Sequence, residues 1–238
     1  MVGTLTPAVE GLNPARRSSE LEALFPAGVV GAELSGEAPA GLLTASELNA
    51  VSHCAAKRIS DFSAGRLCAR RALEAFGLTN VSLLPAPDRL PMWPEAFTGS
   101  ITHTEGYSAA VVTRRGTHLS LGVDSEAIVR VHPELWPRVL GAAELEHVHA
   151  LPEDSRGTVA ALRFAAKEAF YKSQYPLTGE WLEFEDIRIE SGDWHLGAGR
   201  FSVHPQRPLR LQERIAAPLV GRFRVHGGFV SCGVALGR

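Results

Sequence analysis

The sequence predicts an α+β fold, in which helices pack on antiparallel strands. A helical spacing of apolar residues runs from Leu48 to Ile59, and a second one covers residues 159–173. Short strands with turn signals at residues 191–193 and 227–228 fill the C-terminal part. Alternation of apolar and polar residues predicts three further strands, at residues 100–103, 108–113 and 118–126.

The first helical region has a clear start signal. Thr44-Ala45-Ser46-Glu47 has the form of a capping box, in which a hydroxyl and a carboxylate satisfy free backbone N–H groups. A second start at Ser60 is open, and Gly77 is a stop signal. Residues 85–94 contain four prolines and predict an extended connection.

The second helical region is expected to bury one face. Its start is expected at Ser155, which has the side chain of an N-cap. The small and apolar residues that recur at helical spacing are Val159, Leu162, Ala166, Ala169, Phe170 and Ser173.

Length and composition indicate a globular protein. The 238 residues can form one large domain or two of about 120 residues. Apolar residues make up 45% and charged residues 21%, which is ordinary for such a protein. A formal net charge of −2 argues against a nucleic-acid binder, because the phosphate backbone demands a basic surface. An acidic partner protein could still be met by a local basic patch.

Cysteine usage and hydropathy indicate the compartment. Cys54, Cys68 and Cys232 form no C-x-x-C and lie among apolar or small residues, so we interpret them as buried thiols in a reducing compartment. No apolar run is long enough for a signal sequence or a membrane span. We therefore expect a cytoplasmic protein.

Two carboxylates end the strand at residues 118–126. Asp124 and Glu126 are two residues apart, so both project from one face of that strand. Like charges this close require a cation or a proton between them, and oxygen ligands suit Mg²⁺. An isolated D-x-E is common, however, and the alternative is that one acid is exposed or caps the next segment.

The second helical region carries further charges. Glu168 and Lys172 are four residues apart and share one face, and Lys167 precedes Glu168. Three spaced carboxylates can hold a divalent cation while two nearby lysines address phosphate. The alternative for Glu168 and Lys172 is an ordinary ion pair on the solvent side, worth a few tenths of a kcal/mol.

Taken together, these segments resemble the signature of the 4′-phosphopantetheinyl transferase superfamily. That signature is a G-x-D-x-E element, followed about forty residues later by a helix with W/F-x-x-K-E and a further lysine. Two more blocks, at residues 58–70 and 91–107, resemble the bacterial branch of enterobactin synthetase component D and the surfactin-type activators. Phe164 stands where many members carry Trp, and Ser125 replaces an apolar residue, but neither removes a ligand.

The resemblance implies two similar α/β halves related by a pseudo-twofold, with the active site in the cleft between them. The N-terminal half would be residues 1–123 and the C-terminal half residues 124–238. The first would supply Arg58, Arg66 and His103. The second would supply the metal ligands and the catalytic helix.

The resemblance also implies an enzyme, a holo-[acyl-carrier-protein] synthase type of transferase. It would move the phosphopantetheine arm of coenzyme A onto a serine of an apo acyl, peptidyl or aryl carrier protein and release 3′,5′-ADP. Mg²⁺, with Mn²⁺ as an alternative, would be held by Asp124, Glu126 and Glu168. Glu168, directly or through a metal-bound water, would take the serine proton. Lys172 would complete the catalytic pair.

Coenzyme A binding is implied for seven residues: Arg58, Arg66, Arg89, Thr102, His103, Lys167 and Lys172. Arg58 and Arg66 would hold the 3′-phosphate, and Lys167 would contact phosphate or fix the helix. His103 would face the phosphates, or else be a hydrogen-bonded core imidazole. Arg70 and Arg71 are equally well explained as surface charges.

Two other classes of function were weighed. A non-catalytic coenzyme A sensor would not need a base. The presence of Asp124, Glu126, Glu168 and Lys172 together therefore argues against a sensor. A two-metal phosphohydrolase usually needs more Asp and His ligands. The expected partners are coenzyme A and an apo carrier of siderophore, nonribosomal peptide, polyketide or fatty-acid synthesis. We expect a monomer that binds no nucleic acid and spans no membrane.

Overall fold

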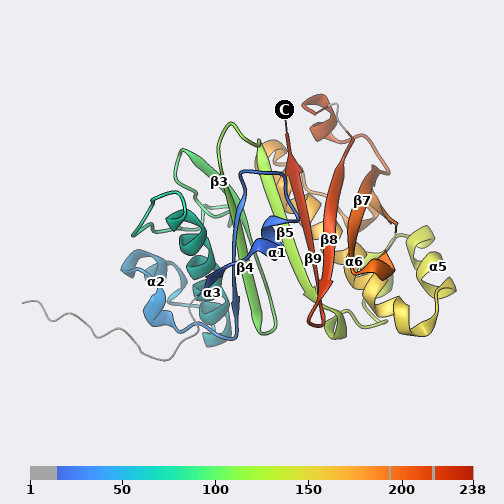
Figure 1. Ribbon diagram of the computed structural model, residues 1–238, viewed down its shortest axis with the longest axis horizontal. Helices are drawn as coiled ribbons and strands as arrows, with labels where there is room; N and C mark the ends of the chain where they lie inside the picture. Colours follow the sequence, from blue (N-terminus) through green and yellow to red (C-terminus); the bar gives the residue numbers. More distant parts are fainter. Residues whose placement is uncertain (1–14, 193, 216–217, 238) are drawn as a thin grey trace, which may run out of the picture.

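Two antiparallel sheets lie side by side, and one long helix packs on each of them (Figure 1). The computed structural model describes residues 15–192, 194–215 and 218–237. The strand order is β1-β2-β4-β3 in the first sheet and β5-β9-β8-β7-β6 in the second. Helix α3 packs on the first sheet and helix α6 on the second.

The chain divides into two parts, one for each sheet. The first part contains β1 (Arg16–Arg17), α1 (Ser19–Glu22), β2 (Val30–Ser35), η1 (Ala40–Leu42), α2 (Ala45–Val51), α3 (Ala56–Glu74), β3 (Phe97–Thr104) and β4 (Tyr107–Arg114). The second contains β5 (Ser120–Ala127), η2 (Ile128–Arg130), α4 (Trp136–Val139), α5 (Ala142–Ala150), α6 (Glu153–Thr178), η3 (Phe184–Asp186), β6 (Ile187–Ser191), η4 (Trp194–Leu196), β7 (Ala198–Pro205), η5 (Arg210–Glu213), β8 (Val220–His226) and β9 (Phe229–Leu236).

Each part has a strand, then a long helix, then antiparallel strands that return to the first. In the first part β2 precedes α3, and the last strand, β4, pairs with β2. In the second part β5 precedes α6, and the last strand, β9, pairs with β5. The predicted α+β class with two similar halves is confirmed. The division after residue 123 stays a prediction, and that position lies inside β5.

Side-chain hydroxyls join the two sheets where β3 meets β5. Ser100 Oγ accepts a hydrogen bond from the backbone N–H of Val123, and Thr102 Oγ1 accepts one from that of Ser125, each over 3.1 Å. These hydroxyls satisfy N–H groups of β5 that face away from β9. We call this junction the seam.

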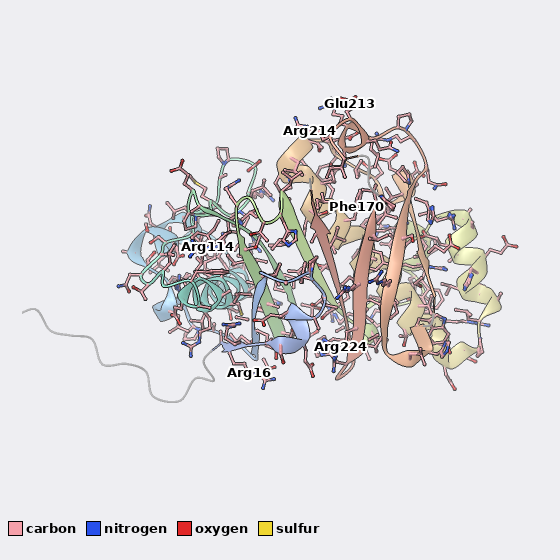
Figure 2. The ribbon with its side chains drawn as sticks, turned by 45° about the horizontal axis from the view of Figure 1, so that its top comes forward. Arg16, Arg114, Phe170, Glu213, Arg214 and Arg224 are labelled. Carbon is pink, nitrogen blue, oxygen red and sulfur yellow. The ribbon has the colours of Figure 1, made fainter. Side chains whose placement is uncertain are left out.

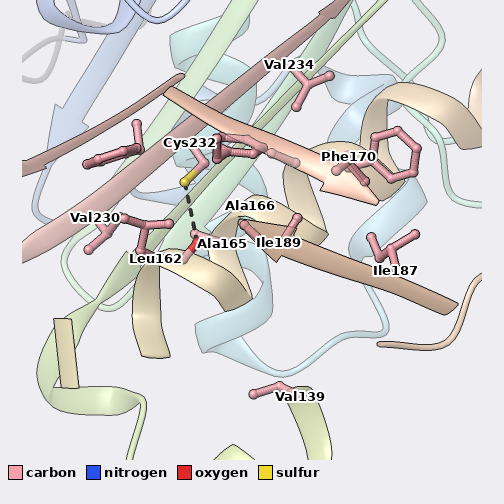
Figure 3. Packing of buried hydrophobic residues seen from close by; sticks show 14 of the residues in the cluster. Val139, Leu162, Ala165, Ala166, Phe170, Ile187, Ile189, Val230, Cys232 and Val234 are labelled. Carbon is pink, nitrogen blue, oxygen red and sulfur yellow. Dashed lines mark hydrogen bonds between the residues drawn. The ribbon is translucent and has the colours of Figure 1, made fainter. Parts of the chain in front are cut away.

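Helix α6 buries the stripe that its sequence predicts. Leu162, Ala166 and Phe170 are fully buried against β6 and β9, and Cys232 Sγ lies 3.7 Å from the Leu162 carbonyl (Figure 3). Figure 2 shows Phe170 inside this half, while Arg16 and Arg224 lie toward the periphery. Each large side chain buried in this way contributes about 1.5–3 kcal/mol.

Gly122 sets the distance between β5 and α6. A Cβ atom on this residue would lie 1.8 Å from the carbonyl oxygen of Ala169 and 2.8 Å from the backbone nitrogen of Ser173. No side chain fits there, so the motif glycine lets the strand and the helix touch backbone to backbone. This contact brings Asp124 opposite Lys172.

Some local predictions need correction. The capping box at Thr44 is confirmed, but α2 ends at Val51 and α3 already begins at Ala56, not at Ser60. Helix α6 begins at Glu153 after Pro152, not at Ser155, because Pro152 fixes the turn and the first acids favour a helix N-terminus.

The stretch of residues 85–94 and one thiol also differ from expectation. The Arg89 N–H donates to the Ala86 carbonyl over 2.8 Å, and the Ala86 N–H donates to the Leu90 carbonyl, so this segment is a tight turn instead of an extended connection. Pro87 favours such a turn. Cys68 and Cys232 are buried as predicted, whereas Cys54 is only half-buried. Among the helices described, none has the length and apolar character needed to cross a membrane.

Candidate functional site

Asp124 is the centre of a charged cluster between β5 and α6. Its Oδ1 accepts hydrogen bonds from Lys172 Nζ over 2.6 Å and from Thr102 Oγ1 over 2.9 Å. Its Oδ2 is buried and has no hydrogen-bond partner. The Asp124 side chain is 5% exposed and that of Lys172 is 29% exposed, so the cluster opens to solvent on the lysine side.

The alternative interpretation of Glu168 and Lys172, an ion pair on the solvent side, is not what forms, because Lys172 pairs with Asp124. Burial lowers the pKa of Lys172, but the nearby carboxylates outweigh this and raise it above its usual value. Lys172 therefore stays protonated.

The neighbouring carboxyl groups crowd around Asp124, so their ionised forms are disfavoured. Burial first, and then Asp124, raise the pKa of Glu126 to about 8, while Lys172 opposes the shift. Burial and Asp124 likewise raise the pKa of Glu168. A further positive charge would relieve this crowding.

The donor set suits a hard cation. Within residues 15–192, 194–215 and 218–237, no three His, Cys, Asp or Glu side chains are arranged as a ready metal centre. The fit therefore rests on chemistry: three carboxylates approach one another, and the buried Oδ2 of Asp124 lacks a partner. Oxygen donors of this kind are the ligands that Mg²⁺ takes.

The first half contributes a basic group near this cluster. Arg58 is exposed in the first turn of α3, which has no acidic residue and no capping side chain. His103, on β3, is 43% exposed, and its Nε2 lies 3.9 Å from Asp61 Oδ2. Burial lowers the pKa of His103, and the positive charges of Lys172 and Arg58 lower it further, while Asp61 opposes the shift. His103 is therefore not a core imidazole.

Two other arginines of α3, Arg66 and Arg70, form hydrogen bonds within the protein. Arg66 is buried, its Nε donates to the Leu83 carbonyl over 2.9 Å, and its guanidinium lies 3.8 Å above the Phe62 ring. Burial lowers the pKa of Arg66 to about 10. Arg70 donates to both carboxylate oxygens of the buried Glu47, so its interpretation as a surface charge is wrong. Residue spacing alone did not reveal that partner.

Arg89 lies on the turn that faces α6. It is exposed, and its backbone φ of 71° falls in the left-handed region, which is uncommon for a residue other than glycine. Its neighbour Asp88 lies near enough to Tyr171 of α6 to help raise the pKa of that phenol to about 12, after burial, Tyr175 and Glu168. The turn thus approaches helix α6.

Two of the predicted ligand-binding residues are engaged inside the protein. Thr102 is 1% exposed, and its hydroxyl serves Asp124 and Ser125. Lys167 is also 1% exposed and donates to Glu144 Oε2 over 2.6 Å. For Lys167 this corresponds to the second expected role, that of fixing the helix.

A pocket that was not predicted from the sequence lies next to Glu168. It has a volume of about 180 Å³, and its wall opposite α6 is formed by Trp181, Leu182, Phe184 and Ile187. Tyr171 contacts Trp181 edge-on with ring centroids 5.5 Å apart. Trp181 is 66% exposed. The apolar and aromatic residues that follow the end of α6 were the signal in the sequence.

Comparisons with known proteins give a consistent result. Residues 46–113 match a family model described as the 4′-phosphopantetheinyl transferase N-terminal domain, and residues 120–217 match that of the 4′-phosphopantetheinyl transferase superfamily. The 4′-phosphopantetheinyl transferase Npt of Nocardia iowensis is 34% identical over 225 residues, which cover 90% of this chain and 99% of that protein.

Two further relatives and one solved structure are also similar to this chain. PptT of Mycobacterium tuberculosis, also a 4′-phosphopantetheinyl transferase, is 35% identical over 86% of this chain and 91% of its own length. Enterobactin synthase component D of Salmonella typhi is 35% identical over 62% of this chain and 59% of its own. Among solved structures, the holo-[acyl-carrier-protein] synthase of Thermotoga maritima is similar over 50% of this chain and 62% of its own, with 22% identity and a TM-score of 0.37.

Proposed function

The chain belongs to the 4′-phosphopantetheinyl transferase superfamily, and on this premise we propose that its cleft binds coenzyme A beside the cluster at Asp124. A transferase of this type moves the phosphopantetheine arm of coenzyme A onto a serine of an apo carrier protein and releases 3′,5′-ADP. The observation that carries the proposal is the meeting of Asp124, Glu168 and Lys172 at the seam between the halves.

The proposed ligands of Mg²⁺ are Asp124, Glu126 and Glu168. The unpartnered Oδ2 of Asp124 and the raised pKa values of the two glutamates support this assignment. A bound Mg²⁺ would neutralise charge on the pyrophosphate of coenzyme A. Lys172, already fixed on Asp124, would present its ammonium to the same phosphates.

Glu168 is our candidate for the general base. A carboxylate with a raised pKa accepts a proton more readily near neutral pH, and burial and Asp124 raise that of Glu168. It lines the pocket, so it would lie beside the phosphate end of a bound coenzyme A, where the serine hydroxyl has to approach. The serine oxygen would then attack the phosphorus that carries the arm, and the bond to 3′,5′-ADP would break.

The first half would hold the nucleotide end of coenzyme A. Arg58 and Arg66 are proposed to bind the 3′-phosphate, and His103 would face the pyrophosphate between Arg58 and Lys172. Arg89 would lie near the adenine side. Thr102 would support this site by orienting Asp124, without a contact to coenzyme A of its own.

The pocket beside Glu168 is the proposed seat of the pantetheine arm. Its wall is apolar and aromatic, which suits the dimethyl group and the two amides along the chain of the arm. Use of Mn²⁺, cytoplasmic location and a monomeric state remain predictions.

The test is a transfer assay. Purified protein, coenzyme A, Mg²⁺ and an apo carrier should give one mass shift of the carrier, and a carrier without its acceptor serine should give none. Binding of coenzyme A without any shift across siderophore, polyketide and fatty-acid carriers would instead indicate a sensor. Release of nucleotide without a carrier would indicate a hydrolase.

A further inference from the structure

Lys167 precedes the proposed base in the sequence and is one of the residues that line the pocket, but its ammonium is held inside the protein. Its ammonium donates to Glu144 Oε2 over 2.6 Å and to the backbone carbonyl of Phe184 over 2.7 Å. The side chains of Lys167 and Glu144 are 1% and 2% exposed. The charged atoms of this pair are therefore removed from solvent.

Glu144 connects four elements, two through its own hydrogen bonds and two through Lys167. Its Oε2 also accepts from the Gly141 N–H over 2.8 Å at the start of α5. Its Oε1 accepts from the Ile189 N–H over 2.7 Å on β6. Lys167 adds α6, and through Phe184 it adds η3. One carboxylate thus fixes the relative positions of α5, α6, η3 and β6.

A buried ion pair such as that of Glu144 and Lys167 contributes little to the free energy of unfolding. Removing two charges from water costs about as much as their attraction returns, and apolar side chains of similar size often stabilise a protein equally well. Two leucine-like residues would pack here, but they could not bind the Phe184 carbonyl and the Ile189 N–H. What the ion pair adds is a fixed position of α6 and α5 relative to the backbone of Phe184 and Ile189.

The fixed geometry is that of the pocket. Phe184 and Ile187 belong to the wall that faces α6, and Glu168 lies on the opposite side, next to Lys167 in the chain. The hydrogen bond from Lys167 to the Phe184 carbonyl ties this wall to the helix that carries the base. Its length therefore sets how far the wall stands from Glu168.

We propose that Glu144 and Lys167 are a positioning pair for the pantetheine arm: they hold the aromatic wall of the pocket at a fixed distance from Glu168. Neither residue touches a phosphate in this arrangement. The inference rests on the proposed function, because it takes the arm as the occupant of the pocket.

The test compares two ligands that differ in the arm. Coenzyme A carries it, whereas adenosine 3′-phosphate 5′-diphosphate lacks it and keeps all three phosphates. In Glu144→Gln and Lys167→Met, calorimetry should show a dissociation constant for coenzyme A raised about tenfold, while that for adenosine 3′-phosphate 5′-diphosphate changes less than about twofold. The KM for coenzyme A should rise in parallel.

Folding is checked by urea denaturation. Each single variant leaves one buried charge without its partner, whereas Glu144→Gln/Lys167→Met leaves none and should recover stability without recovering arm binding. Tyr107→Phe is the matched control. It removes a buried 2.9 Å hydrogen bond to Glu33 in the other half, so it should lose stability and keep the wild-type ratio of the two dissociation constants.

Two results would overturn the pair's role. One is a Lys167→Met protein that loses affinity for adenosine 3′-phosphate 5′-diphosphate as much as for coenzyme A, since that identifies a phosphate contact. The other is a folded Glu144→Gln protein with wild-type affinity for coenzyme A. Failure of the wild-type protein to bind coenzyme A or to modify a carrier would be a failure of the proposed function itself, and the pair's role would fall with it.

Discussion

Thr102 Oγ1 donates a hydrogen bond to Asp124 Oδ1 over 2.9 Å across the seam between the two sheets. The same oxygen accepts from the backbone N–H of Ser125 over 3.1 Å. The Thr102 hydroxyl thus binds both the backbone of β5 and the carboxylate of Asp124, which β5 carries. Because Thr102 and Lys172 both occupy Oδ1, the other oxygen of Asp124 is left for a different ligand.

Thr102→Val keeps the shape of the side chain but removes both hydrogen bonds. A buried hydrogen bond to a charged group contributes about 1.5–3 kcal/mol, so the free energy of unfolding should fall by about this amount and turnover should fall about tenfold. Urea denaturation and the transfer assay measure the two effects. Ser100→Ala loses a seam hydrogen bond that does not involve Asp124, and it should reduce stability while keeping turnover. Equal loss of turnover in both variants would show that Thr102 acts only through the seam.

Asp124→Asn and Glu126→Gln test the cation. Each should lower turnover about a hundredfold and weaken the dependence on Mg²⁺, because a neutral amide is a poorer ligand than a carboxylate. Glu126→Gln should keep the stability of the fold, since it relieves like-charge repulsion, whereas Asp124→Asn also loses the ion pair with Lys172 and should lower the free energy of unfolding. Titration of turnover against Mg²⁺, with circular dichroism as a check of folding, measures this. A variant with wild-type turnover at limiting Mg²⁺ would exclude that residue as a ligand.

Arg58→Ala and Arg66→Ala test the 3′-phosphate. Losing one charge-assisted contact should raise the KM for coenzyme A about ten- to a hundredfold with little change in kcat. Both variants should lose most of their preference for coenzyme A over dephospho-coenzyme A. Arg66→Ala should also reduce stability, because Arg66 is buried on Phe62 and Leu83, whereas the exposed Arg58 should not. An undiminished preference in either variant assigns that arginine a structural role only.

Gly122→Ala should prevent the close contact of β5 and α6. A Cβ atom 1.8 Å from the Ala169 carbonyl cannot be accommodated without moving the strand. We expect a loss of more than about 2 kcal/mol in the free energy of unfolding, and a loss of activity in any protein that folds. Gly41→Ala is the control, because a Cβ atom there meets no other atom within 4 Å. Similar stability of the two variants would contradict the proposed contact.

His226 should make stability depend on pH. Burial lowers its pKa below 6.5, with Glu20 and Glu33 opposing the shift, and its Nε2 lies 3.0 Å from Ser231 Oγ. As pH falls through 6.5 the unfolded chain takes up the proton first, so this residue's contribution to stability is present above that pH and is lost below it. Urea denaturation at pH 7.5 and pH 5.5 should show a larger loss for the wild type than for His226→Gln. Equal losses would exclude His226 as the cause.

The sequence contained enough to predict the buried stripe of α6 and the shared face of Asp124 and Glu126. Both depend on periods of about 3.6 and two residues, which local spacing reveals. Helix starts were less accurate. Pro152 and the acids after it begin α6 two residues before Ser155, because several local signals compete at a helix end.

The sequence by itself determined which side chains are the candidates for the chemistry and from which face each one projects. Only the tertiary structure decided their partners. Lys172 bonds to Asp124, 48 residues away, and Lys167 to Glu144, 23 residues away, while Arg70 bonds to Glu47. The physical reason is that a charged side chain is bound by whichever opposite charge is buried beside it, and burial depends on how distant segments pack together.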